Sequence, residues 1–261
     1  MNVLEYEMID MLKRLKYEYG VFEIKAEYES EGSRQVELMR LKDVVDRVDL
    51  PIILKIGGVE ALTDMYEALS LGARGIIAPM AETAFAASKF LNMIDVFVPE
   101  DNQRDIEFAI NIETITAFQN LDEILRLPKL NLLQSITVGR VDFCGSMGKD
   151  RKFADSPEIL DQCITIFRKV REKKLKTALG GAISNESELF IRTLVDQNLI
   201  DKYETRKLVY RNTGVENFVA GLTEGIKFEL LWLKSKRRYY HRIHKEDEKR
   251  IAMLEARVAE K

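Results

Sequence analysis

The sequence predicts an α/β fold, a (β/α)8 TIM barrel that continues into an extended C-terminal helical segment. The chain has 261 residues, which suits one barrel domain better than two small domains. Short apolar runs alternate with segments of helical periodicity, as in the repeated strand–helix units of a parallel sheet. These runs are nearly continuous, which is typical of parallel strands covered on both faces.

Seven strands are visible in this pattern, and we expect the eighth to be too short or too irregular to recognise. An open, doubly wound sheet is the alternative, but no Gly-x-Gly-x-x-Gly turn follows the first strand. The expected strands cover residues 21–25, 52–56, 75–79, 107–112, 135–138, 177–179 and 203–209.

The helices expected between these strands cover residues 34–48, 60–71, 83–93, 117–125, 157–173 and 186–198. After about Val215 the strand pattern stops, and apolar residues such as Trp232 recur at helical spacing among dense mixed charge. We therefore predict a barrel domain over residues 1–214 and a helical extension over residues 215–261. The extension is expected to pack on its own barrel or on a neighbouring subunit, and the second possibility predicts a homo-oligomer.

The composition argues against several classes of protein. The 40 basic and 43 acidic residues give a net charge of −3, without the basic excess of proteins that bind nucleic acid. Two cysteines are too few for a disulfide framework and indicate a reducing compartment. No apolar run is long enough to span a membrane, and the N-terminus is amphipathic and acidic rather than signal-like. We expect a cytoplasmic protein that binds neither membranes nor nucleic acid.

Two carboxylates follow adjacent expected strands, Glu113 in INIETITAF and Asp142 in TVGRVDFCGSMG. The carboxyl ends of barrel strands meet at one rim, where barrel enzymes place their working residues. Convergent carboxylates suit a hard cation such as Mg²⁺ or Mn²⁺. Alternatively, Glu113 caps the next helix and Asp142 orders a glycine-rich turn.

Cationic residues lie at the same rim. Lys55 ends the second expected strand beside two glycines, Arg140 precedes Asp142, and Arg206 with Lys207 lies on the last expected strand. Together they would form a cationic mouth suited to a phosphorylated or multiply anionic substrate. The alternative is that Lys55 is solvated and that Arg206 or Lys207 merely pairs with Glu204.

The stretch from Asn111 to Gly148 carries a more specific pattern. It contains Glu113-Thr114, then Asn120-Leu121, then Gly139-Arg140-Val141-Asp142-Phe143, and ends in Gly148. An earlier element, GARGIIAPMAETAFAA over residues 72–87, precedes it. These motifs resemble the HpcH/HpaI aldolase and citrate lyase β-subunit family, within the phosphoenolpyruvate/pyruvate barrel superfamily. The resemblance spans roughly residues 22–209.

The resemblance implies Mg²⁺ or Mn²⁺ on Glu113 and Asp142, with a pyruvate-like 2-oxo acid as the substrate. It further implies that Lys55, where the family usually has arginine, stabilises an enolate, helped by Arg140. Backbone N–H groups around Val141 would bind the substrate carboxylate.

This chain departs from the family after the first strand. Ala26-Glu27-Tyr28 stands where related aldolases read Gly-Glu-His, so the histidine assigned to proton transfer is missing. Glu27 is therefore the expected acid–base group, with Tyr28 or a metal-bound water as alternatives. Asn111 stands where the family often has glutamine and is expected to bind substrate, as is Arg206.

These features predict a metal-dependent carbon–carbon lyase or aldolase that acts on a 2-oxo acid through an enolate. Two alternatives within the superfamily use phosphoenolpyruvate or a CoA thioester. A third alternative is a catalytically inactive barrel that serves as a binding or assembly subunit. The intact pair of Glu113 and Asp142 argues against it.

Overall fold

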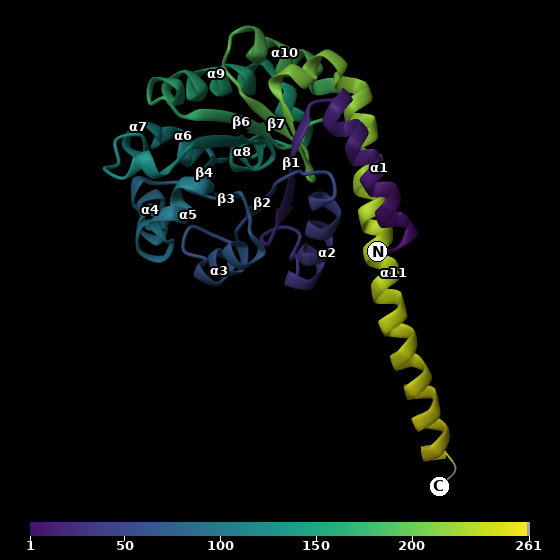
Figure 1. The fold of residues 1–261 in the computed structure, drawn as a ribbon. Helices are drawn as coiled ribbons and strands as arrows, with labels where there is room; N and C mark the ends of the chain where they lie inside the picture. Colours follow the sequence, from purple (N-terminus) through teal and green to yellow (C-terminus); the bar gives the residue numbers. More distant parts are fainter. Residues whose placement is uncertain (260–261) are drawn as a thin grey trace.

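The computed structural model describes residues 1–259, in which eight strands close into a barrel surrounded by helices (Figure 1). The predicted barrel class is therefore confirmed. The strands are β1 (Val21–Glu27), β2 (Ile52–Lys55), β3 (Gly75–Ala78), β4 (Glu107–Ile112), β5 (Ser135–Gly139), β6 (Lys176–Gly180), β7 (Lys202–Glu204) and β8 (Leu208–Arg211).

The last strand runs against the others, unlike the last strand of a regular (β/α)8 barrel. Neighbouring strands from β1 to β7 are parallel, whereas β8 is antiparallel to both β7 and β1. The single strand expected over residues 203–209 is in fact a hairpin, and its turn at Thr205–Lys207 lies at the carboxyl end of β7. The eighth strand is thus the second half of a segment that looked like one strand.

The helices follow the expected order, with differences at their ends. They are α1 (Val3–Glu18), α2 (Gln35–Asp46), α3 (Leu62–Leu71), α4 (Ala84–Phe97), α5 (Glu100–Asp105), α6 (Ile115–Gln119), α7 (Leu121–Ile124), α8 (Arg140–Ser146), α9 (Pro157–Glu172), α10 (Glu188–Asp196) and α11 (Phe218–Ala259). The helix expected over residues 117–125 is divided into α6 and α7 at Asn120. The short helices α5 and α8 were not expected.

The main core lies between the strands and the surrounding helices. The barrel interior holds a much smaller apolar cluster, formed by Ile53, Ile77, Ala109 and Val209. Charged and polar side chains occupy the interior beside this cluster. Near the amino-terminal end, the Lys202 ammonium lies 3.1 Å from Glu23 and 2.7 Å from Glu107. Buried charges are tolerated only where they are paired, and these ions are paired.

Helix α11 lies beside α1 and then extends well beyond the barrel (Figure 1). Its first half packs through buried Phe228 and Trp232, and Arg14 on α1 pairs with Glu224 on α11 at 3.0 Å. Residues 241–252 are all exposed. Within residues 1–259, no helix combines the length and the hydropathy needed to cross a membrane.

Candidate active site at the carboxyl end of the barrel

Glu113 directly follows β4 and is almost completely buried, with 2% of its surface exposed. Its Oε1 accepts a hydrogen bond from the Met80 backbone N–H at 3.0 Å, and its Oε2 accepts one from Asn111 Nδ2 at 2.9 Å. The Lys55 ammonium lies 3.6 Å from the same Oε2. Burial raises the pKa of Glu113, and the charge of Asp142 adds to this effect, against the opposing charge of Lys55. The carboxylate is therefore fixed in position and needs positive charge nearby.

Asp142 lies in the first turn of α8, in an exposed position near Glu113. The backbone of Gly139 passes close enough to Glu113 that a Cβ at residue 139 would lie 2.5 Å from Glu113 Oε2. The structure thus places both predicted metal ligands at the same rim, close enough for the charge of Asp142 to raise the pKa of Glu113. Both are hard oxygen donors, and Mg²⁺ commonly binds through one or two carboxylates while keeping several waters. The donor set fits a divalent cation.

No larger ligand group surrounds this pair. Among residues 1–259, no three or more histidine, cysteine, aspartate or glutamate side chains gather in a way that would hold a metal ion. A cation on Glu113 and Asp142 would therefore take its remaining ligands from water and from a substrate. Open positions of this kind distinguish a catalytic metal site from a closed structural one.

The Gly139→Ala variant is expected to lose metal binding while remaining folded. A methyl group at residue 139 would overlap the Glu113 carboxylate, which would have to move from its present position. We expect the affinity for Mn²⁺ to fall by about tenfold or more, in the range seen when metal ligands lose their orienting contacts. Isothermal titration with Mn²⁺ measures this change. Gly145→Ala, where the added methyl meets no neighbour within 4 Å, is the control. Equal affinities in the two variants would contradict the expectation.

Lys55 ends β2 and connects two carboxylates at the mouth. Its ammonium lies 2.9 Å from Glu29 Oε2 and 3.6 Å from Glu113 Oε2. Burial opposes the charge on Lys55, but Glu113 and Glu29 outweigh it and raise the pKa of the ammonium. Lys55 therefore stays protonated at the position expected for it. Glu29 was not singled out from the sequence, because it is one of three glutamates at alternate positions in one loop.

Glu27 is held by its neighbours rather than free to exchange protons. Its Oε1 lies 3.2 Å from the Lys25 ammonium, and its Oε2 accepts a short hydrogen bond from the Ser30 hydroxyl. Burial would raise the pKa of Glu27, but Lys25, Ser30 and Lys55 lower it overall. Both oxygens of Glu27 already have strong partners, so neither is free to take up a substrate proton, and these contacts do not favour the predicted acid–base role. The alternative Tyr28 instead donates its hydroxyl hydrogen to Gln35 Oε1 at 3.0 Å.

Arg140 does not face the mouth, and the structure corrects its predicted role. The side chain is completely buried, and its Nε and Nη2 donate to the Gly181 carbonyl at 3.1 and 2.9 Å. Its Nη1 donates to the Ala154 carbonyl at 3.1 Å and pairs with Asp155 at 2.5 Å. Nη2 also lies 3.3 Å from Ser187 Oγ. With its donors used in this way, Arg140 connects the loops after β5 and β6 and is not placed to stabilise an enolate.

The backbone of Val141 closely approaches the loop after β6. Gly181 has a φ of +79°, and a Cβ at residue 181 would lie only 2.8 Å from the Val141 nitrogen. Glycine is required at residue 181 both by its left-handed conformation and by this approach. The predicted contact of Val141 with substrate stays a prediction.

Arg206 is accessible at the mouth, whereas Asn111 is buried beside Glu113. Arg206 is in the β7–β8 turn, half-exposed, with Nη1 3.4 Å from Ser30 Oγ and 3.8 Å from Glu27 Oε2. Asn111 is 3% exposed, and its Oδ1 accepts no hydrogen bond although its Nδ2 is bound to Glu113. A buried acceptor without a donor is costly, so a ligand that donates a hydrogen bond would be favoured there.

The mouth is not cationic, contrary to the expectation from the sequence. Each of its cations is paired with one or two carboxylates, and Lys207 is buried against Glu31 at 2.5 Å, where burial lowers its pKa. The carboxylates of these pairs are Glu27, Glu29, Glu31, Glu113 and Glu204, and Asp142 lies near them. The cations are Lys25, Lys55, Arg206 and Lys207. Six negative and four positive groups leave two formal negative charges, which one divalent cation would balance.

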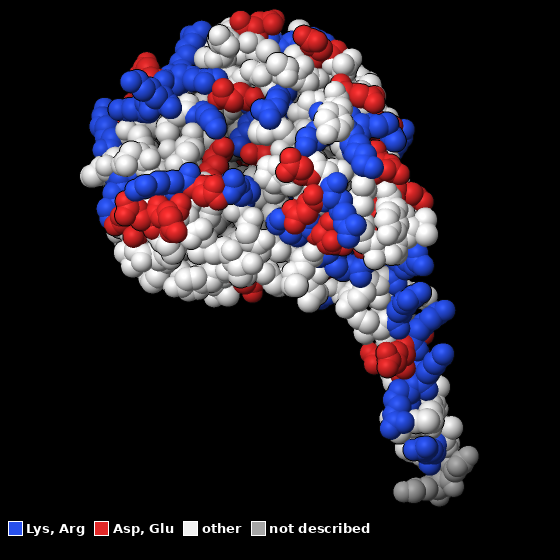
Figure 2. All heavy atoms as spheres, in the orientation of Figure 1, with Lys and Arg blue, Asp and Glu red and all other residues white. Residues whose placement is uncertain are grey.

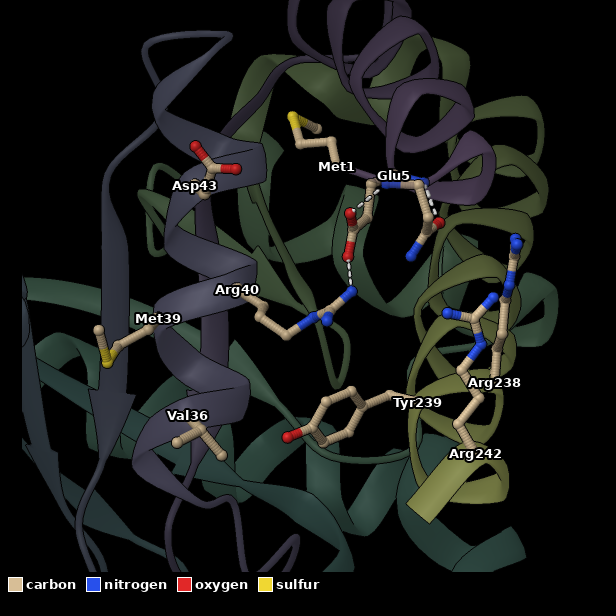
Figure 3. A pocket seen from close by; sticks show the side chains of 10 residues that line it. Met1, Glu5, Val36, Met39, Arg40, Asp43, Arg238, Tyr239 and Arg242 are labelled. Carbon is tan, nitrogen blue, oxygen red and sulfur yellow. Dashed lines mark hydrogen bonds and ion pairs between the residues drawn. The ribbon is translucent and has the colours of Figure 1, made fainter. Parts of the chain in front are cut away.

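A separate hollow of about 600 Å³ lies outside the barrel, between the start of α1, α2 and α11 (Figure 3). Arg40 pairs there with Glu5 and lies over the Tyr239 ring, 5.2 Å from its centroid. Arg238 and Arg242 line the same hollow. The part of α11 from residue 241 to residue 259 is called the projecting part below. Lys and Arg are prominent along it in the space-filling view (Figure 2). This hollow contains none of the residues at the mouth.

A closed barrel with Glu113 and Asp142 at its carboxyl end defines an architecture of the (β/α)-barrel class. The family is identified by sequence: the model of the HpcH/HpaI aldolase/citrate lyase family matches residues 52–188, more than half of the chain, and the protein belongs to this family. A comparison with curated proteins gives no match.

Solved structures of the same family resemble this fold. The HpcH/HpaI aldolase from Desulfitobacterium hafniense DCB-2 is 13% identical, with a TM-score of 0.60 over 85% of this chain and 89% of that chain. An HpcH/HpaI aldolase/citrate lyase family protein from Burkholderia cenocepacia J2315 is 11% identical, with a TM-score of 0.61 over 92% and 90%. A citrate lyase from Burkholderia xenovorans LB400 is 12% identical, with a TM-score of 0.59 over 82% and 72%. At these identities the likeness shows the fold alone.

Proposed function

We propose that the protein is a divalent-metal-dependent carbon–carbon lyase or aldolase that acts on a pyruvate-like 2-oxo acid. The observation that supports this proposal is that Glu113 lies at the carboxyl end of the barrel within the electrostatic influence of Asp142 and 3.6 Å from the protonated Lys55. Membership of the aldolase/citrate lyase family supports the same class of reaction.

Glu113 and Asp142 would hold Mg²⁺ or Mn²⁺, which when bound supplies a Lewis acid for the keto oxygen of the substrate. Around that position the chain itself prepares the site. The Met80 N–H and the Asn111 amide fix the Glu113 carboxylate, so no reorganisation is needed during the reaction. Lys55 remains charged and would face the negative charge that develops on the enolate oxygen.

The charge balance favours a substrate with one carboxylate over a phosphorylated one. The ion pairs of the mouth and Asp142 together carry two formal negative charges. One divalent cation would bring this set of groups to neutrality. A phosphoryl group would add further negative charge and would find no unpaired cation in that set. We therefore favour the 2-oxo acid itself over phosphoenolpyruvate. No feature of the described residues specifically favours the CoA thioester.

The direct test is thermal unfolding of the purified protein with Mg²⁺ or Mn²⁺, alone and with pyruvate, oxalate or phosphoenolpyruvate. Oxalate carries the two adjacent oxygen donors of an enolised 2-oxo acid. A ligand at a hundredfold excess over its dissociation constant stabilises the folded state by about 2.7 kcal/mol. We expect oxalate to raise the melting temperature only when metal is present. The absence of a shift under every combination would reject the proposal and favour an inactive barrel.

We also propose that the protein forms a homo-oligomer through the projecting part of α11, which exposes apolar side chains. Ile243, Ile251 and Leu254 are 45%, 53% and 43% exposed on that part. Exposed apolar side chains grouped on one helix are often covered by a partner. The cytoplasmic location predicted from the sequence stays a prediction.

The double variant Ile251→Asp and Leu254→Asp is expected to lower the molar mass measured by light scattering after size-exclusion chromatography. Two charges in a covered apolar contact would be desolvated without partners, which disfavours association. The control is Ala252→Asp, at an exposed neighbouring position on the same helix. If the wild-type protein elutes as a monomer, or if the double variant keeps its molar mass, this interface is wrong.

A further inference from the structure

The mouth of the barrel contains no imidazole that could transfer a proton. The two histidines of the chain, His241 and His244, both lie in the projecting part of α11. The end of β1 and the loop that follows it bring three glutamates to the mouth: Glu27, Glu29 and Glu31. Their surroundings differ enough to assign each a separate role.

Two of these glutamates anchor the loop. Glu27 is tied to Lys25 and Ser30, as described above. Glu31 Oε2 accepts a hydrogen bond from the backbone N–H of Glu27 at 3.2 Å, and it pairs with the buried ammonium of Lys207 at 2.5 Å. The side chains of Glu27 and Glu31 are 8% and 12% exposed, and both are committed to strong partners.

Glu29 lies between these anchors and is more open, with 28% of its side chain exposed. Its Oε2 lies 2.9 Å from the Lys55 ammonium, which in turn lies 3.6 Å from Glu113 Oε2. This contact is an ion pair, and it is one of the interactions that raise the pKa of Lys55. A partly exposed carboxyl group whose contact at the mouth is Lys55, one ammonium group away from the candidate metal ligand, has the geometry of a general base.

We propose that Glu29 is the proton-transfer residue of this site, an inference that rests on the proposed function. The Glu29 carboxylate takes a proton from the carbon next to the keto group of the bound 2-oxo acid. The electron pair of that C–H bond becomes the C=C bond of the enolate, and the carbonyl π electrons move to the oxygen that faces Lys55. The proton on Glu29 then exchanges with water, and when the enolate carbon is reprotonated the C=C electron pair forms a C–H bond to a proton that comes from solvent, which is a deuteron in D₂O. Glu29 therefore changes protonation state while Lys55 remains charged.

This step is measured without a second substrate, as exchange of the methyl protons of pyruvate with D₂O, followed by proton NMR in the presence of Mg²⁺. We expect Glu29→Gln to slow the exchange by about 10²- to 10⁴-fold, the usual contribution of a positioned acid–base group. Glu29→Asp, which keeps the carboxylate, is expected to exchange faster than Glu29→Gln. Metal-dependent stabilisation by oxalate should persist in Glu29→Gln, because Glu29 is not a metal ligand.

The matched control is Glu60→Gln, a carboxylate in the next loop of the same rim that pairs with Lys89 at 3.0 Å. It should exchange at the wild-type rate. Wild-type exchange in Glu29→Gln, or oxalate binding without any exchange in the wild-type protein, would overturn the role of Glu29 while leaving the metal site intact. Loss of oxalate stabilisation in Glu29→Gln would also overturn it, since Glu29 would then act in binding. If the wild-type protein shows no metal-dependent oxalate binding, both the proposed function and this inference fail.

Discussion

Glu113→Gln and Asp142→Asn are each expected to abolish metal-dependent turnover of a 2-oxo acid without unfolding the protein. A bound cation contributes several kcal/mol to stabilising the transition state, and each 1.36 kcal/mol corresponds to a tenfold change in rate. The loss should therefore reach about 10³-fold in kcat/KM. It is measured by following pyruvate release or consumption at saturating Mg²⁺.

The two variants should differ in their stability. Glu113 is buried, and burial raises its pKa, so an amide at this position removes a desolvated charge but leaves Lys55 with one carboxylate fewer. Asp142 is exposed, so the free energy of unfolding of Asp142→Asn should lie within about 0.5 kcal/mol of the wild-type value. Glu60→Gln again serves as the control. Full rates in both variants would show that the metal assignment is wrong.

Replacing Arg140 is expected to give the largest loss of stability among the residues discussed. Arg140→Met would remove hydrogen bonds to the Gly181 and Ala154 carbonyls and leave Asp155 without its cation. Breaking a buried ion pair by removing one partner typically costs about 3–5 kcal/mol. Asp155 keeps 23% of its side chain exposed, so the lower half of that range is expected. Urea denaturation followed by circular dichroism measures the free energy of unfolding.

Arg206→Met provides the comparison, because Arg206 is half-exposed and its nearest carboxylate contact is 3.8 Å. Exposed ion pairs contribute about 0–1 kcal/mol to stability, so the free energy of unfolding of this variant should be close to the wild-type value. If Arg140→Met were as stable as Arg206→Met, the connecting role of Arg140 between the two loops would be untenable.

The strands from β1 to β6 were predictable because each is an apolar run bounded by turns, and their positions agree with the structure to within a few residues. The hairpin of β7 and β8 was not, because its turn, Thr205-Arg206-Lys207, has no glycine, proline or asparagine to mark it. Its fold depends on the Thr205 N–H and the Leu208 carbonyl, which are 2.9 Å apart from N to O. Such a contact leaves no periodic signal in a sequence.

At the candidate site, position along the chain predicted which residues reach the rim but not which way their side chains turn. Glu113, Asp142 and Lys55 follow or end strands and lie where the barrel rule puts them. Arg140 is next to Asp142 in sequence, yet it turns into the protein because Gly181 and Asp155 hold it there. Glu27 pairs with Lys25 of its own strand, whereas Glu29 pairs with Lys55 from β2, and sequence spacing does not reveal the second pairing.

The antiparallel last strand also bears on how the specificity of this barrel can change. A regular eightfold barrel offers a connecting loop after every strand at its working face, and each can lengthen independently. Here β8 carries the chain back to the opposite end, and the connection after β7 is the tight Thr205–Lys207 turn. Six loops, those after β1 to β6, remain able to accept insertions. Engineering for larger substrates should therefore target these loops, because lengthening the hairpin turn would disturb the closure of the barrel itself.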